Sequence, residues 1–176
     1  MTKNIYKGRI VNLNLETVTL PNGATVELEI IHHPGAAAVV PMKDDRTVVL
    51  IRQYRHAVGR TIYEIPAGTC EPKEPMLACA KRELAEEAGY AARYWRKVCH
   101  FYPAPGISTE WMTLFVATGL TPLKKPVAMD EDEQITVRRT SMPKVLRMVR
   151  KNEIIDVKSM IGILWGLERI RWTAFK

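Results

Sequence analysis

The segment from Pro75 to Gly89 constrains the fold most, because it has the period of a helix and two chemically different sides. Its apolar positions recur at steps of three and four residues, at Leu77, Ala80, Leu84 and Ala88. Pro75 suits the first turn of a helix, and Gly89 suits a C-terminal cap. We therefore expect a helix over 75–88 that packs its apolar side against the rest of the domain.

Strand-like segments surround this helix. The two most apolar runs, 36–42 and 47–51, are typical of neighbouring buried strands. The other expected strands are 17–20, 25–30, 61–66, 97–102, 112–117 and 135–138. Two more helices are expected, one near 143–151 after the candidate cap Ser141 and one near 157–171 after Asp156.

The first two of these strands indicate a separate unit at the N-terminus. They alternate polar and apolar residues around Pro21-Asn22-Gly23, a strong turn signal. The most plausible boundary lies near Pro34. We expect a small antiparallel sheet over 1–34, and one domain with its own core over 35–176, since a chain of 176 residues that is 47% hydrophobic can bury a sizeable core.

Charge and cysteine content narrow the class of protein. The net charge of +7 favours a polyanionic partner. The basic residues near the C-terminus lack any nucleic-acid motif and are interpreted as a solvated helix face, so we expect a phosphorylated small molecule and no nucleic acid. With no secretory signal and no apolar run of membrane length, we expect no membrane partner and a cytoplasmic protein. Three cysteines without a CxxC pair indicate reduced thiols.

The second side of the 75–88 helix is acidic. Glu83, Glu86 and Glu87 lie within one helical turn, so their carboxylates are expected to project together from an exposed helix face. Such like charges repel, and the C-terminal end of a helix disfavours negative charge. The alternative is a solvated glutamate-rich surface. A hard cation among the carboxylates resolves the repulsion, and Mg²⁺ is the natural candidate.

The surrounding spacing favours the metal. The pattern is Gly68, five residues, Glu74, seven residues, Arg82-Glu83-Leu84, one residue, Glu86-Glu87, one residue and Gly89-Tyr90. Its chance agreement is on the order of 10⁻⁹ to 10⁻⁸ per starting point. This stretch resembles the signature of the Nudix hydrolase family. The resemblance implies an α/β fold, an α/β/α sandwich with a mixed central sheet, whose signature loop and helix support divalent metal ions.

The resemblance also implies roles for individual residues. Glu83 and Glu87 look like principal metal ligands, with Glu86 beside them and the backbone carbonyl of Ala67 as another ligand. Glu74 and Arg82 look like a structural ion pair that orients the helix. The metal is expected to be Mg²⁺, with Mn²⁺ as the alternative, and to neutralise the oxygens of a pyrophosphate diester during attack by water.

Features outside the signature resemble the ADP-ribose pyrophosphatases of this family. They are the proline motif at 104–110, Gln53-Tyr54-Arg55, and the segment 63–68. Arg55 is expected to contact the diphosphate, a role that suits a guanidinium fork. The expected substrate-binding residues are Arg55, Glu64, Ala104, Pro105, Gly106 and Glu110.

The acidic run 130–133 resembles the loop that supplies a late glutamate in that subfamily. Glu131 is a candidate general base, and Glu133 a candidate ligand of a further metal ion. The reverse assignment, and Glu86 as the base, stay open. A solvated loop is the alternative.

The leading hypothesis is an ADP-ribose pyrophosphatase that releases AMP and ribose 5-phosphate. The nearest alternative is a pyrophosphatase for another nucleoside diphosphate sugar, such as GDP-mannose or ADP-glucose. An alternative of another class is a non-catalytic Nudix sensor that binds ADP-ribose. The subfamily resemblance also implies a homodimer in which the N-terminal sheets are exchanged.

Overall fold

The computed structural model describes residues 1–44, 46–125 and 134–173, with side chains as far as Trp165. The described strands are β1 (Thr2–Lys7), β2 (Asn12–Thr19), β3 (Thr25–His32), β4 (Ala36–Asp44), β5 (Thr47–Arg55), β6 (Arg60–Glu64), β7 (Ala67–Thr69), β8 (Tyr90–Phe101), β9 (Met112–Pro122) and β10 (Ile135–Ser141). The described helices are η1 (His56–Val58, a 3₁₀ helix), α1 (Met76–Ala88), α2 (Met142–Arg150) and α3 (Val157–Thr173).

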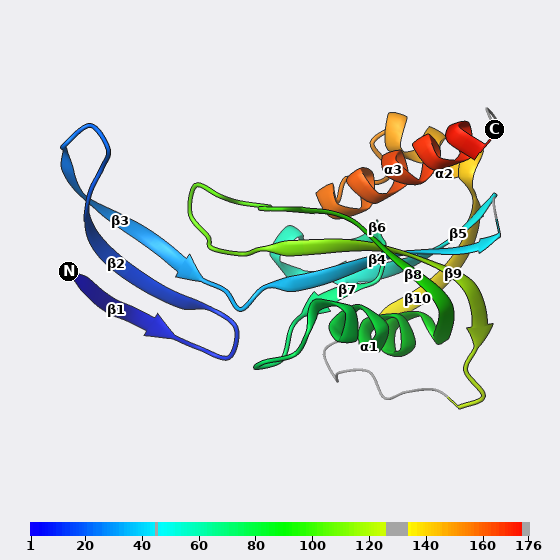
Figure 1. Ribbon diagram of the computed structural model, residues 1–176, viewed down its shortest axis with the longest axis horizontal. Helices are drawn as coiled ribbons and strands as arrows, with labels where there is room; N and C mark the ends of the chain where they lie inside the picture. Colours follow the sequence, from blue (N-terminus) through cyan, green and yellow to red (C-terminus); the bar gives the residue numbers. More distant parts are fainter. Residues whose placement is uncertain (45, 126–133, 174–176) are drawn as a thin grey trace.

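The strands form two sheets. The small sheet is antiparallel in the order β1-β2-β3, and most of it projects from one end of the large sheet (Figure 1). The large sheet has the order β10-β5-β4-β9-β8, with β6 added to β5 and β7 added to β4. It is mixed, because β4 and β9 are parallel whereas the other pairs are antiparallel. Helix α1 lies on one face, and α2 and α3 lie on the other (Figure 1). The fold is therefore the expected α/β/α sandwich.

Strand β4 shows why this sheet needs helices on both faces. Successive side chains of a strand point to opposite faces. Ala38 and Val40 join the core cluster that includes residues of α2 and α3, whereas Val39 packs with Leu84 of α1. The uninterrupted apolar run at 36–42 thus reflects burial on both sides, as expected for a central strand.

Helix α1 begins and ends within one residue of its predicted bounds. Pro75 is the N-cap residue, and Gly89 adopts a left-handed conformation with a φ of 71° just after the helix. The Gly89 N–H donates to the carbonyl oxygen of Ala85 at 3.1 Å. This conformation favours glycine, because a side chain there is strained.

Some elements differ from the sequence-based expectation. Strand β1 was not predicted, because all six of its residues are exposed and leave no alternating pattern. Strand β7 was expected to be a loop, and its three residues are too few for a periodic signal. Ser141 is the N-cap residue of α2 but makes no side-chain cap bond. Asp156 does cap α3, because its Oδ2 accepts from the Ser159 N–H at 3.0 Å. Every helix in the described part of the chain is too short or too polar to cross a bilayer.

The contact between α3 and the sheet gives a stability prediction. A Cβ at Gly162 would lie 2.7 Å from Cγ2 of Val40 and 3.2 Å from Cδ1 of Ile65, both in the buried core. Overpacking of this kind costs about 1 to 3 kcal/mol, against a gain of up to about 1 kcal/mol in helix propensity. Gly162→Ala should therefore lower the free energy of unfolding, as measured by urea denaturation. Leu164→Ala, at a side chain that is 52% exposed on the same helix, is the control and should change stability by less than about 0.5 kcal/mol.

Candidate active site

The site begins where α1 packs on β7. Gly68 lies directly beneath the Glu83 carboxylate, and a Cβ built on Gly68 would fall 2.0 Å from Glu83 Oε1 and 2.3 Å from Cδ. Any side chain at position 68 would displace this carboxylate. Glycine is therefore needed here for close approach rather than for an unusual φ.

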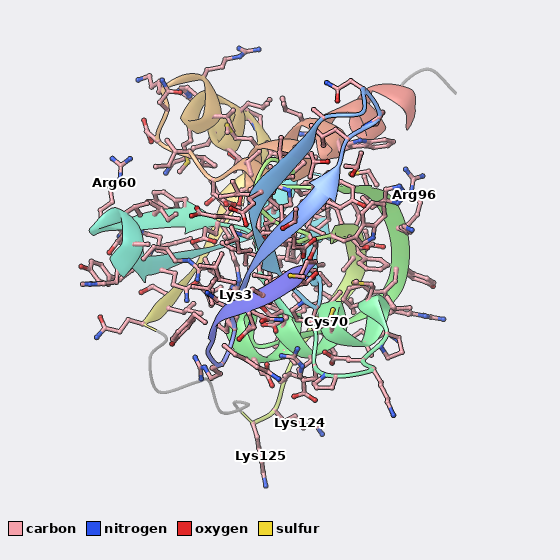
Figure 2. All side chains as sticks on the ribbon, turned by 90° about the vertical axis from the view of Figure 1, so that its left-hand side faces the viewer. Lys3, Arg60, Cys70, Arg96, Lys124 and Lys125 are labelled. Atoms are coloured by element: carbon pink, nitrogen blue, oxygen red, sulfur yellow. The ribbon has the colours of Figure 1, made fainter. Side chains whose placement is uncertain are left out.

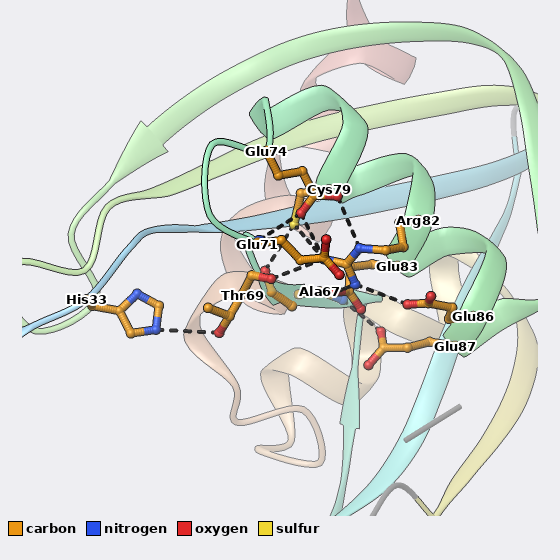
Figure 3. A network of polar contacts seen from close by, with 11 residues as sticks. His33, Ala67, Thr69, Glu71, Glu74, Cys79, Arg82, Glu83, Glu86 and Glu87 are labelled. Carbon is orange, nitrogen blue, oxygen red and sulfur yellow. Dashed lines mark hydrogen bonds and ion pairs between the residues drawn. The ribbon is translucent and has the colours of Figure 1, made fainter. Parts of the chain in front are cut away.

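Glu87 is fixed to the same strand. Its Oε2 accepts a hydrogen bond from the Ala67 N–H at 2.8 Å (Figure 3). Glu83 is only 6% exposed and Glu87 only 2% exposed. The expectation of an exposed acidic helix face was therefore wrong for these two residues, because β7 covers the side of the helix from which they project.

Arg82 is shared by three carboxylates (Figure 3). Its Nε and Nη2 donate to the two oxygens of Glu74 at 3.1 and 3.0 Å. Its Nη1 donates to Glu83 Oε1 at 2.6 Å and to Glu86 Oε2 at 3.1 Å. The hydrogen bonds from Arg82 hold the pKa of Glu74 below its ordinary value. The arginine thus joins the loop before α1 to the acidic side of the helix.

The donor set fits a hard divalent cation. Glu83, Glu86 and Glu87 bring carboxylate oxygens to one end of α1 beside the backbone of Ala67. Oxygen-only donors of this kind suit Mg²⁺ or Mn²⁺. Arg82 pairs with two of these carboxylates and with Glu74. A divalent cation bound among the three glutamates would reduce the repulsion between their like charges.

A cleft of about 660 Å³ opens over these groups. Ala67, Gly68, Glu83 and Glu86 line one part of it, and Arg55 lines another part together with the end of β5. Residues of the β1–β2 turn also reach it. The Arg55 side chain is 40% exposed, so its guanidinium is accessible from the cleft.

Arg55 is held from below by a buried ion network. Its Nε donates to Glu64 Oε1 at 2.7 Å, and its Nη2 donates to Oε2 at 2.9 Å. Lys158 of α3 forms a second ion pair with Glu64, and its Nζ also lies 3.0 Å from Asp156 Oδ1. Ser159 Oγ donates to Asp156 Oδ2 at 2.5 Å and accepts from the Ile65 N–H at 2.8 Å.

This network changes the interpretation of Glu64. The residue is 1% exposed and is not in the cleft wall, so it positions Arg55 and is not placed to touch a substrate itself. Sequence reasoning missed Lys158. The available signal was a lysine in the first turn of a helix whose first half is mostly apolar, two residues after the Asp156 cap.

The network gives a pH prediction. Burial alone would raise the pKa of Glu64, but the hydrogen bonds from Arg55 and the charge of Lys158 hold this pKa below its ordinary value. As the pH falls, Glu64 is therefore protonated in the unfolded chain before it is protonated in the folded protein. The contribution of ionised Glu64 to the free energy of unfolding is complete above about pH 4.5 and is lost as the pH falls further. Urea unfolding of the wild type and Glu64→Gln should differ most above about pH 4.5 and converge in acid. A difference that stayed constant between pH 6 and about pH 3 would contradict this prediction.

The sequence is similar to a known domain family and to characterised proteins. The profile of the NUDIX domain matches residues 32–157. The chain belongs to the NUDIX domain family. An ADP-ribose pyrophosphatase of Bacillus subtilis is 37% identical over 161 residues, covering 92% of this chain and 87% of that protein. A methanol dehydrogenase activator of Bacillus methanolicus is 36% identical over 162 residues, covering 92% of this chain and 88% of that protein.

A solved structure shares the fold. The crystal structure of an ADP compounds hydrolase superimposes with a TM-score of 0.84 and 20% sequence identity, and it covers 98% of this chain and 93% of the other. Within this Nudix fold, the segment from Gly68 to Tyr90 is the Nudix signature, and it comprises β7, the following loop and α1.

The other expected site residues lie elsewhere. In this Nudix chain the loop at 104–110 packs against the small sheet, because the Ile31 N–H donates to the Ile107 carbonyl at 2.8 Å and the Thr109 N–H donates to the Ile31 carbonyl at 3.0 Å. Ala104, Pro105, Gly106 and Glu110 do not line the cleft formed by the described residues. Glu131 and Glu133 lie outside the described residues.

Proposed function

We propose that this Nudix hydrolase cleaves the pyrophosphate bond of a nucleoside diphosphate sugar, and that ADP-ribose, yielding AMP and ribose 5-phosphate, is its substrate. One observation carries the proposal: the cleft brings the Glu83 and Glu86 carboxylates to the same space as the Arg55 guanidinium. Carboxylates suit a divalent ion, and a guanidinium suits a diphosphate. The relative from Bacillus subtilis, which bears the name of this activity, supports the choice of ADP-ribose.

The metal ligands in this proposal are Glu83, Glu86, Glu87 and the Ala67 carbonyl. Mg²⁺, or Mn²⁺ in its place, would supply positive charge to the phosphate oxygens and favour ionisation of the attacking water. Arg82 contributes by holding Glu83 and Glu86 through Nη1, while Glu74 holds the other side of the same guanidinium. The ligands are thus oriented before any ion binds.

Arg55 is proposed to bind the diphosphate. Glu64 accepts from its Nε and Nη2, and no described residue accepts from its Nη1. The guanidinium of Arg55, held in place by Glu64, can therefore donate its remaining N–H groups to phosphate oxygens in the cleft. Glu64 and Lys158 limit the rotation of this side chain, which lowers the entropy lost when a diphosphate binds.

The general base is proposed to be Glu131, with Glu133 as a further metal ligand, and Glu86 is the alternative base. Ala104, Pro105, Gly106 and Glu110 are proposed to shape the sugar site. Other residues of the same loop, Ile107, Ser108 and Thr109, pair with Ile31 of β3, so the position of this loop depends on the small sheet.

We also propose that the protein is a cytoplasmic homodimer that pairs through the small sheet. In Figure 2 this sheet stands in front of the body of the molecule, and none of the described helices or strands forms a second layer over it. The large exposed hydrophobic residues of this sheet and of its β1–β2 turn include Ile5, Tyr6, Ile10, Val11 and Leu28. A second copy would remove this apolar surface from water. Sedimentation equilibrium should give twice the chain mass of 20.0 kDa.

A substrate panel tests the function. Purified protein is incubated with Mg²⁺ and ADP-ribose, ADP-glucose, GDP-mannose, UDP-glucose, NADH, a diadenosine polyphosphate or 8-oxo-dGTP, and the products are separated by chromatography. We expect the highest kcat/KM for ADP-ribose, and no cleavage when a chelator removes the metal. Preference for GDP-mannose would favour the alternative nucleotide sugar. Tight binding of ADP-ribose without cleavage would favour the sensor and overturn the hydrolase.

A further inference from the structure

A second cluster of metal-ligating side chains lies beside the Nudix signature glutamates. The ligand atoms of Cys70, Glu74 and Cys79 all lie within 4.8 Å of one another. Cys70 directly follows β7, Glu74 lies in the next loop, and Cys79 belongs to α1. Figure 2 labels Cys70, and Figure 3 shows Cys79 and Glu74 close to Arg82.

The chemistry of this cluster differs from that of the carboxylate site. It contains two thiols, and the Met76 thioether sulfur lies 3.4 Å from Cys70 Sγ. Sulfur donors select soft ions such as Cu(I), Cd²⁺ and Zn²⁺, whereas Mg²⁺ takes oxygen. Zinc–sulfur bonds of about 2.3 Å place two ligands of a tetrahedral ion about 3.8 Å apart. Small side-chain movements would therefore let the cluster close around one ion.

The cluster can be reached from the cleft. Cys79 is fully buried, but Cys70 is among the residues that line the cleft, together with Thr69 and Glu71. Both thiols are uncrosslinked. Burial raises the pKa of each, so they are protonated until an ion displaces the protons, which then pass to solvent.

We propose that Cys70, Cys79 and Glu74, with Met76 as a fourth donor, bind one thiophilic ion of the Zn²⁺, Cd²⁺ and Cu(I) class. Coordination would also disturb the carboxylate site. Glu74 holds Nε and Nη2 of Arg82, and the same Nη2 lies 3.5 Å from Cys79 Sγ. An ion bound there competes for the Glu74 oxygens and repels the guanidinium that orients Glu83 and Glu86.

Binding is tested with Cd²⁺ as the probe, in excess Mg²⁺ so that oxygen sites are filled. The wild type should develop thiolate-to-cadmium charge-transfer absorption in the ultraviolet that saturates at one equivalent. Cys70→Ser and Cys79→Ser should each abolish this saturating signal. Cys99→Ser, which removes the third free cysteine from outside the cluster, should retain it. Equal loss in Cys99→Ser, or full signal in both other variants, would overturn the proposal.

A measurement on the wild type covers the case in which a serine variant does not fold. X-ray absorption spectroscopy of the one-equivalent cadmium complex should give at least two sulfur neighbours, and a shell of oxygen and nitrogen alone would overturn the proposal. This measurement and the absorption titration do not depend on the proposed hydrolysis.

The effect on activity rests on the proposed function. Pretreatment with one equivalent of Cd²⁺ should lower hydrolysis of ADP-ribose by about 10- to 100-fold in the wild type and Cys99→Ser. A loss of this size is expected when the residue that orients metal ligands, here Arg82, is displaced. Folded Cys70→Ser should resist this inhibition. A protein that binds Cd²⁺ through sulfur but hydrolyses nothing would refute the function and leave the thiophilic site standing. Equal inhibition of Cys70→Ser would refute the coupling between the two sites.

Discussion

Glu83→Gln and Glu87→Gln are each expected to lower kcat/KM for ADP-ribose by at least about 1,000-fold while the fold is retained, because a lost metal ligand removes several kcal/mol of transition-state stabilisation. Glutamine keeps the shape of the side chain and one acceptor oxygen. The bond from the Ala67 N–H to position 87 can therefore survive the substitution. Steady-state kinetics across a magnesium titration would measure the effect, with circular dichroism and thermal unfolding to confirm the fold.

Glu153→Gln is the matched control, since Glu153 is an exposed glutamate in the turn between α2 and α3. It should change kcat/KM less than about twofold, as expected for a surface substitution away from the site. Activity of Glu83→Gln or Glu87→Gln within about tenfold of wild type at saturating magnesium would contradict the metal assignment.

Gly68→Ala should lower activity about 100-fold or more, because a shift of about 1 Å in a catalytic group can have an effect of that size. The added Cβ would fall 2.0 to 2.6 Å from three atoms of Glu83, all of them at the end of its side chain. The carboxylate can swing aside without moving the backbone, so the free energy of unfolding should change far less than the activity. The magnesium concentration for half-maximal activity should rise.

A double-mutant cycle separates this explanation from a general disturbance. If Gly68→Ala acts by displacing the Glu83 carboxylate, it should add little to the loss already caused by Glu83→Gln. Full additivity of the two effects would show that alanine at position 68 damages the site by another route. If Gly68→Ala and the wild type unfold at the same urea concentration, the loss of activity does not come from lower stability.

The elements that could be predicted from sequence are those with local signals. Helix α1 has apolar periodicity and a glycine cap, so both its bounds were predicted within one residue. The apolar runs of β4 and β5 reveal burial directly. Strand β1 has no buried side, and periodicity reports burial, so that strand was not predicted.

In the candidate site, too, the features with a local sequence signal could be predicted and those that depend on long-range contacts could not. The spacing of Glu83, Glu86 and Glu87 follows from the helical period, so their projection from one side of α1 could be predicted. The burial of Glu83 and Glu87 could not be predicted, because it depends on β7, a strand of three residues that pairs with β4 through a long-range contact. The role of Glu64 depends on Lys158 and Arg55 meeting it in three dimensions, and no local pattern in the sequence contains that information.

The ion network beneath Arg55 has a consequence for the order in which the protein can become functional. Glu64 and Lys158 are 94 residues apart in the chain, and Lys158 also forms an ion pair with Asp156 in the same network. While the protein is being synthesised, Arg55, Glu64 and the whole signature leave the ribosome before Lys158 does. A nascent chain that ends before α3 lacks the lysine that pairs with Glu64, so the ion network beneath Arg55 is completed only after α3 has been synthesised.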